Sequence, residues 1–261
     1  MTNEILVPLS DGKKGFADID CRIYRSPCNE RDILCDRRVL SCVPPDETKE
    51  LLLKKLEKYR KKTVGFGFTS LCYPPDEKVL RLTESALETI YDAGNPVWIE
   101  TKSTVILRDT GLISMIARKN GATVTVPVFT DDGMSPVFEK NTPLPSERFE
   151  MISRLSAAGI RCGVICAPVI AYLTDSRRKM IRIAEQSAEA GAQFIVRDMG
   201  LFLTEKFKPA FFSAVEEYFP GFSALYDNFN GNYLSIPRRR FIEEAFDGAC
   251  MNTGLKIIER S

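Results

Sequence analysis

The chain has 261 residues, of which 44% are hydrophobic and 27% charged, and its formal net charge is +1. This composition is typical of a folded domain and excludes a disordered chain. The near-neutral charge does not favour nucleic acid as a partner. The absence of histidine excludes Ser-His-Asp catalysis, Cys-His catalysis and His-ligated metal sites. Since barrels of this length are commonly undivided, we expect one domain over residues 1–261.

The sequence does not suggest a membrane-spanning segment or a secretory signal. The first stretch, MTNEILVPLSDGKKG, lacks an apolar run like that of a secretory signal, and the longest nearly apolar run, 162–173, is too short to span a bilayer. We therefore expect a cytoplasmic protein with no membrane partner. Because that compartment is reducing, the eight cysteines indicate metal binding or core packing rather than disulfides.

Strand and helix patterns alternate along the chain. Asp46 is the expected N-cap of the first helix and Asp175 that of the last. The expected strands cover 16–25, 63–69, 96–101, 123–130, 161–170 and 193–200, and the expected helices cover 46–62, 77–94, 111–121, 146–159 and 175–191.

This alternation predicts right-handed crossovers and a parallel sheet. Six strand-helix units are too few for a closed eight-stranded barrel, so we predict an α/β fold with a partial, open (β/α)6 barrel. A doubly wound sheet is the second possibility. The tail after about Pro209 is expected to add helices that pack on the barrel.

In either architecture the active site lies at the carboxyl ends of the strands. Ser70, Lys102 and Thr130 follow three of the expected strands. Arg148 and Arg197 are candidate anion contacts near strand or helix ends. Lys102 also permits an alternative from another class, a barrel lyase that forms a Schiff base with a carbonyl substrate.

Four cysteines, Cys21, Cys28, Cys35 and Cys42, are spaced seven residues apart. Pro27 interrupts any helix that would place them on one face. The spacing also differs from that of zinc fingers and ribbons, whose paired ligands lie two to four residues apart. Taken alone, the pattern leaves metal binding and core packing both open.

The neighbouring residues carry a resemblance. Around Cys28 and Cys35 the chain reads IYR, then C-x-x-x-D-x-x-C, then D. Three later segments read GFGFTSLCYPPDEKVLRLT (65–83), ETKSTVILRD (100–109) and EKNTPLPSERFEMISRLSAAGI (139–160). In this order they resemble the patterns NxYRGCxHGCxYCD, GTGSxSDPYxPxExxLxLT, xTKSxLxLRD and EPxxPxxxxRxExxxxLxxxGI of radical S-adenosylmethionine enzymes of the spore photoproduct lyase-like group. The resemblance covers roughly residues 20–235.

The resemblance implies a 4Fe–4S cluster and S-adenosylmethionine as cofactors. In the family three cysteines bind three irons, and S-adenosylmethionine occupies the fourth. Cys28 and Cys35 match two of these ligands, but Asp32 stands in place of the third. The third ligand is therefore Asp32 itself or a displaced cysteine, for which Cys72 is best placed, or else the cluster is absent. A carboxylate is a harder donor than a thiolate and would change the stability and potential of the cluster.

The resemblance also implies a function. Ser70, Lys102, Thr130, Arg148 and Arg197 are the expected cofactor-binding residues, with Lys102 on the cofactor carboxylate. The expected reaction is reductive cleavage of S-adenosylmethionine to start radical chemistry on an unknown substrate, with an electron donor such as ferredoxin or flavodoxin. The alternative is a non-enzymatic scaffold that has lost cluster binding and binds a ligand or partner.

Overall fold

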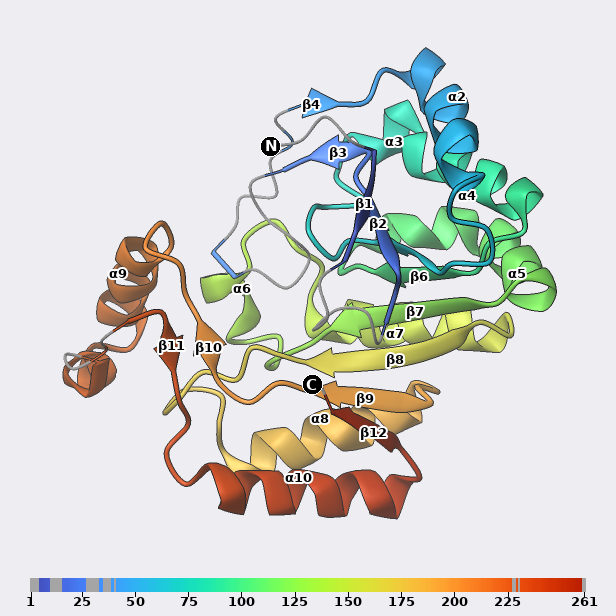
Figure 1. The fold of residues 1–261 in the computed structure, drawn as a ribbon. Helices are drawn as coiled ribbons and strands as arrows, with labels where there is room; N and C mark the ends of the chain where they lie inside the picture. Colours follow the sequence, from blue (N-terminus) through green and yellow to red (C-terminus); the bar gives the residue numbers. More distant parts are fainter. Residues whose placement is uncertain are drawn as a thin grey trace.

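The computed structural model describes residues 5–9, 16–26, 33–34, 39, 41–226, 229 and 231–259. Within them, eight strands form one curved sheet (Figure 1). β1 pairs antiparallel with β2, and every later pair is parallel. In spatial order the strands are β1 (Leu6–Pro8), β2 (Ile19–Cys21), β5 (Val64–Phe66), β6 (Val97–Glu100), β7 (Ala122–Pro127), β8 (Arg161–Cys166), β9 (Phe194–Arg197) and β12 (Lys256–Glu259).

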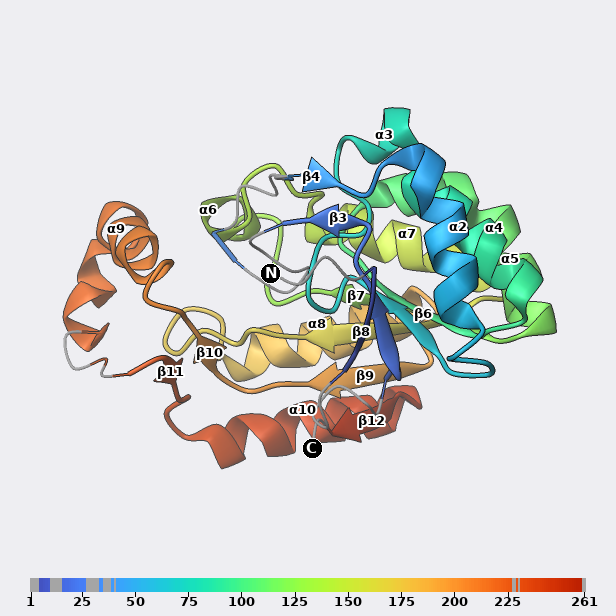
Figure 2. The same ribbon diagram turned by 45° about the horizontal axis from the view of Figure 1, so that its top comes forward.

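The long helices cover the outer face of this sheet (Figures 1 and 2). They are α2 (Pro45–Leu56), α4 (Leu82–Ala93), α5 (Thr110–Lys119), α7 (Pro145–Ala157), α8 (Arg177–Glu189) and α10 (Arg239–Thr253). Shorter elements lie beyond the carboxyl ends of the strands or in connections: β3 (Tyr24–Arg25), β4 (Ser41–Cys42), α3 (Glu77–Leu80), η1 (Thr104–Asp109), α6 (Ser135–Phe138), β10 (Leu201–Phe202), α9 (Lys208–Tyr218), η2 (Pro220–Tyr226) and β11 (Tyr233–Leu234). In the part of the chain that the structure describes, no helix is long and apolar enough to cross a membrane.

Successive side chains along a strand point alternately into two apolar layers. In β6, Val97 and Ile99 belong to the core shared with the helices, whereas Trp98 belongs to a second cluster inside the barrel. Because both faces are covered, all four residues of this strand are buried. The predicted partial barrel is therefore confirmed, and the pairing order leaves its first and last described strands unpaired with each other.

The tail differs from the prediction of added helices. α9 and α10 are present, but β12 continues the sheet as a seventh parallel strand beside β9. Its sequence, KIIE, is too short to produce a periodic signal, and its pairing depends on a strand some sixty residues earlier in the chain, from Phe194. The tail thus extends the barrel as well as packing on it.

Several predicted helix ends were wrong. α2 begins after Pro44, because a proline at the first helical position suits a helix start, and Asp46 lies inside the helix. The expected helix over 77–94 is divided at Arg81, which has a φ of 51°. The N-cap of α8 is Ser176 rather than Asp175, and the Ser176 side chain accepts a hydrogen bond from the Lys179 amide.

Candidate active site

Three predicted site residues follow three neighbouring strands. Ser70 lies beyond β5, Lys102 beyond β6 and Thr130 beyond β7. Parallel strands end at the same edge of a sheet, so these residues share one edge, the one that faces α6 in Figure 1. Arg197 ends β9 at the same edge. Four of the predicted site residues therefore lie along one edge of the sheet.

A buried ion-pair cluster occupies this edge. The Lys102 Nζ atom lies 2.6 Å from Glu139 Oε1, and an Arg148 Nη2 atom lies 2.6 Å from Glu139 Oε2. Arg148 also donates to the Pro127 and Pro143 carbonyls at 2.9 and 2.8 Å. All three charged residues are at most 4% exposed. The structure therefore joins two predicted cofactor contacts through a glutamate.

The electrostatics of Glu139 follow from these neighbours. Burial by itself would raise the pKa of the Glu139 carboxyl, but attraction to Lys102 and Arg148 lowers the pKa from 4.5 to about 2. The Ser135 hydroxyl also donates to Glu139 Oε2, at 3.0 Å. Glu139 is therefore ionised at neutral pH and holds both cations in place.

Ser70 and Thr130 are buried polar residues whose hydroxyls lack described partners. They are 4% and 2% exposed, and their hydroxyls have no hydrogen-bond partner among the residues that the structure describes. A buried hydroxyl without a partner costs free energy, so most such groups in folded proteins are satisfied. Two of them at one edge, beside a buried cluster of charges, indicate that polar groups of a ligand could complete the site.

Arg197 has a different environment. Its Nη1 atom lies 2.5 Å from the Asp247 Oδ1 atom of α10. The guanidinium therefore connects the sheet edge to the last helix of the barrel. This arrangement neither tests nor excludes the predicted role of Arg197 as a cofactor contact, which stays a prediction.

The predicted cluster ligands divide into two groups. Cys28, Asp32 and Cys35 lie outside the described residues. Cys72 is described: it follows β5, is 3% exposed, and its thiol donates to the Glu100 carbonyl at 3.4 Å. Within the described ranges no group of three or more Cys, His, Asp or Glu is arranged to hold a metal ion. The assignment of metal ligands therefore stays a prediction.

The other cysteines behave as core residues. Cys21 lies in β2, as expected, and Cys162, Cys166 and Cys250 are fully buried with free thiols. Burial raises the pKa of Cys162 to about 12, and burial with a smaller contribution from Asp247 does the same for Cys250. Such thiols are protonated and unreactive at neutral pH.

The motif segments also contain a network that the sequence reasoning missed. The Glu77 carboxylate accepts hydrogen bonds from the Tyr24 hydroxyl and, at 3.0 Å, from the Thr83 amide, and it pairs with Arg108 at 2.7 Å. Arg108 also contacts Asp109 at 2.6 Å. These residues belong to the YR, ExxLxLT and LRD parts of the resemblance. Their role is structural, because they tie β3 to the segment that follows Lys102.

The missed residues share a recognisable signal. Glu139 and Glu77 each lie in one of the motif segments that carry the resemblance, and each is at most 4% exposed. Each also lies in a motif that contains, or is followed by, an arginine with which it pairs. A buried carboxylate needs such a partner, so the pairing could have been anticipated from the motifs but its geometry could not.

Comparison with sequences gives a partial match. No family model matches the chain. Uncharacterised proteins of Mycobacterium bovis and Mycobacterium tuberculosis are 33% identical over 135 residues, which is 51% of this chain and 40% of each relative. The match thus spans about two fifths of the length of these curated relatives.

Comparison with solved structures identifies the fold. Spore photoproduct lyase complexed with dinucleoside spore photoproduct has a TM-score of 0.64 at 14% identity, over 95% of this chain and 78% of that chain. Streptococcus suis SuiB bound to S-adenosylmethionine has a TM-score of 0.56 at 10% identity, over 92% of this chain and 48% of that chain. The chain therefore shares its partial barrel fold with these two proteins.

Proposed function

We propose that this chain is an iron-sulfur protein of the radical S-adenosylmethionine superfamily. The observation that carries the proposal is the carboxyl edge itself, where Ser70, Lys102 and Thr130 follow adjacent strands and two buried hydroxyls have no partner among the described residues. The shared fold with SuiB, whose structure holds S-adenosylmethionine, supports this proposal.

In this proposal the cofactors are a 4Fe–4S cluster and S-adenosylmethionine. When bound, the cluster would supply the electron for reductive cleavage of S-adenosylmethionine. An electron donor such as ferredoxin or flavodoxin would then return an electron to the cluster. Cys28 and Cys35 would be two ligands of the cluster, and Asp32 or Cys72 would be the third. The donor set fits iron in part, because two thiolates and an oxygen donor can ligate it.

The residues of the carboxyl edge would bind S-adenosylmethionine. The Ser70 and Thr130 hydroxyls would form hydrogen bonds with polar groups of S-adenosylmethionine. Lys102 would attract the carboxylate of S-adenosylmethionine, and Glu139 fixes the position of the Lys102 ammonium group. Arg148 orients Glu139 from α7. The buried surroundings strengthen these contacts and exclude water from the site.

Two alternative functions each relate to a specific feature of the chain. A non-enzymatic scaffold is favoured by the replacement of a ligand cysteine by Asp32. A Schiff-base lyase using Lys102 would need a neutral amine, whereas the 2.6 Å ion pair with Glu139 favours the charged ammonium. Borohydride trapping of a carbonyl substrate on Lys102 separates the lyase from the other two.

Anaerobic reconstitution with iron and sulfide tests the proposal. We expect bound iron and the absorption of a 4Fe–4S cluster, both lost in the Cys28→Ala, Cys35→Ala double variant. The matched control is Cys162→Ala, which removes a buried thiol of the core. Iron retained in the double variant contradicts the proposed ligands, and no bound iron in the unaltered chain favours the scaffold.

The third ligand is resolved by two single variants. If Asp32 is the ligand, Asp32→Cys raises iron occupancy and stability to oxygen, because thiolate binds the cluster iron more tightly than carboxylate. If Cys72 is the ligand, Cys72→Ala removes the cluster and Asp32→Ala does not. Iron content and spectra measured in parallel separate these cases.

A further inference from the structure

A pocket lies at the end of the barrel opposite the candidate active site. It has a volume of about 510 Å³ and lies where β6, β7 and β8 begin, with Val97, Ala122 and Arg161 in its wall. The candidate active site lies where the same strands end. This size falls within the range of small-molecule sites, about 300–1,000 Å³. The pocket is therefore separate from the residues of the proposed function and large enough for a ligand.

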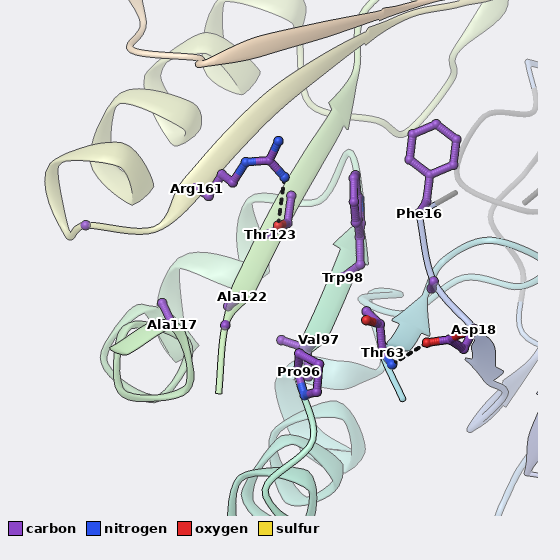
Figure 3. Close-up of a pocket in the computed structure, with 13 residues that line it drawn as sticks. Phe16, Asp18, Thr63, Pro96, Val97, Trp98, Ala117, Ala122, Thr123 and Arg161 are labelled. Atoms are coloured by element: carbon purple, nitrogen blue, oxygen red, sulfur yellow. Dashed lines mark hydrogen bonds between the residues drawn. The ribbon is translucent and has the colours of Figure 1, made fainter. Parts of the chain in front are cut away.

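One side of the pocket is aromatic. Trp98 meets Phe16 edge to face, with ring centroids 5.0 Å apart, and Phe194 at 5.9 Å. The Trp98 indole N–H donates to the Thr125 hydroxyl at 3.0 Å, which orients the ring. Figure 3 shows Trp98 and Phe16 beside each other along the pocket. An oriented aromatic wall suits a flat, apolar ligand surface.

One cation faces this aromatic wall. The Arg161 guanidinium lies 4.4 Å from the Phe194 ring centroid and 5.9 Å from that of Trp98. Its one hydrogen bond to another described side chain is a long one, 3.4 Å to the Thr123 hydroxyl, which Figure 3 shows. A guanidinium has five N–H donors in a planar fork, so this arginine retains donors for an anion.

The acidic group of the pocket is already engaged. Asp18 accepts a hydrogen bond from the Thr63 amide at 2.8 Å and lies 3.5 Å from the Lys62 ammonium. In Figure 3 it lies across the pocket from Arg161. The negative charge of Asp18 is therefore compensated away from Arg161, and among the described residues that line the pocket the exposed charge on the aromatic side is that of Arg161.

From this geometry we propose that the pocket binds a planar aromatic anion. Its ring would lie in the apolar part formed by Trp98, Phe16, Pro96 and Ala122, and its carboxylate or phosphate would accept hydrogen bonds from Arg161. The proposal is independent of the cluster and of S-adenosylmethionine, because the pocket includes none of their predicted ligands. The chain would thus carry a second ligand site at the amino end of its barrel.

The single tryptophan of the chain provides the test. Protein labelled with 5-fluorotryptophan has one ¹⁹F signal, that of Trp98, which we would titrate with 2-naphthoate and separately with the uncharged 2-naphthalenemethanol. We expect a saturable shift with 2-naphthoate and binding on the order of tenfold weaker for the alcohol, because it lacks the charge-assisted hydrogen bonds.

Arginine variants complete the experiment. Arg161→Gln should weaken 2-naphthoate binding on the order of tenfold and leave the affinity for the alcohol unchanged, and Arg161→Lys should restore part of it. Arg178→Gln, an exposed arginine at the start of α8, is the matched control and should bind normally. An unshifted Trp98 signal, equal binding of the two probes, or normal 2-naphthoate binding by Arg161→Gln overturns the proposal.

Discussion

The two ends of the barrel are built from opposite chemistry. At the carboxyl end, Glu139 joins Lys102 and Arg148 in a buried ionic cluster beside two hydroxyls without described partners. At the amino end, Phe16, Trp98 and Phe194 fill the interior with aromatic rings. The first arrangement costs desolvation free energy and the second gains it from apolar burial.

This difference shows that the two ends contribute differently to stability. The aromatic end can stabilise the barrel without a ligand, because its rings bury apolar surface and the Trp98 indole N–H is bonded to the Thr125 hydroxyl. The ionic end holds buried charges that pair with one another and two hydroxyls without described partners, an arrangement that is common at functional sites. The comparison can be tested by changing one end at a time.

The largest effect is expected from Glu139→Gln. This change removes the negative charge between Lys102 and Arg148 and should lower the free energy of unfolding by about 3–5 kcal/mol. Urea denaturation followed by circular dichroism measures it. The control is Glu84→Gln, which breaks a more exposed pair with Arg81 and should cost about 0–1 kcal/mol. Equal losses in the two variants would show that the buried cluster is not special.

The same cluster predicts an acid dependence. The pKa of Glu139 is lowered to about 2, so its contribution to stability is complete above pH 4.5 and is lost as the pH falls towards 2. The loss is on the order of 3 kcal/mol for this shift. Denaturation at a series of pH values should show this dependence in the unaltered chain and a smaller one in Glu139→Gln. An identical dependence in both would contradict the ionised buried carboxylate.

At the amino end, Gly163→Ala should cost about 1–3 kcal/mol of stability. An added Cβ would overlap the buried ring of Phe194, which packs edge to face against Trp98. Thermal unfolding measures the change. Gly111→Ala in α5, where an added Cβ meets nothing, is the control and should be neutral or stabilising. A neutral Gly163→Ala would mean that the aromatic end is loosely packed.

The smallest effect on stability is expected from Thr130→Val. The hydroxyl has no described partner, so its removal should be neutral or stabilise the fold by up to about 1 kcal/mol. Affinity for S-adenosylmethionine should nevertheless fall several-fold, measured by equilibrium dialysis of the reconstituted protein. Thr89→Val on α4, whose hydroxyl bonds the Ser85 carbonyl, controls for the substitution. Unchanged affinity would remove Thr130 from the proposed site.

The strands were predictable because their signal is local. The run PVWIET became β6, Val97–Glu100, and QFIVRDMG contains β9, Phe194–Arg197. Each apolar run is bounded by residues that end a strand, so element type follows from a few neighbouring positions. The same reasoning placed Ser70, Lys102 and Thr130 at the carboxyl ends, since parallel strands in one sheet end together.

The sequence by itself therefore determined the alternation of strands and helices, the partial barrel and the edge at which candidate site residues gather. Only the tertiary structure decided that Glu139 meets both Lys102 and Arg148, that β12 pairs with β9, and that Trp98 packs between Phe16 and Phe194. The physical reason is that these contacts join segments far apart in the chain. Local propensity carries no record of such partners, and they form only when the sheet brings the strands together.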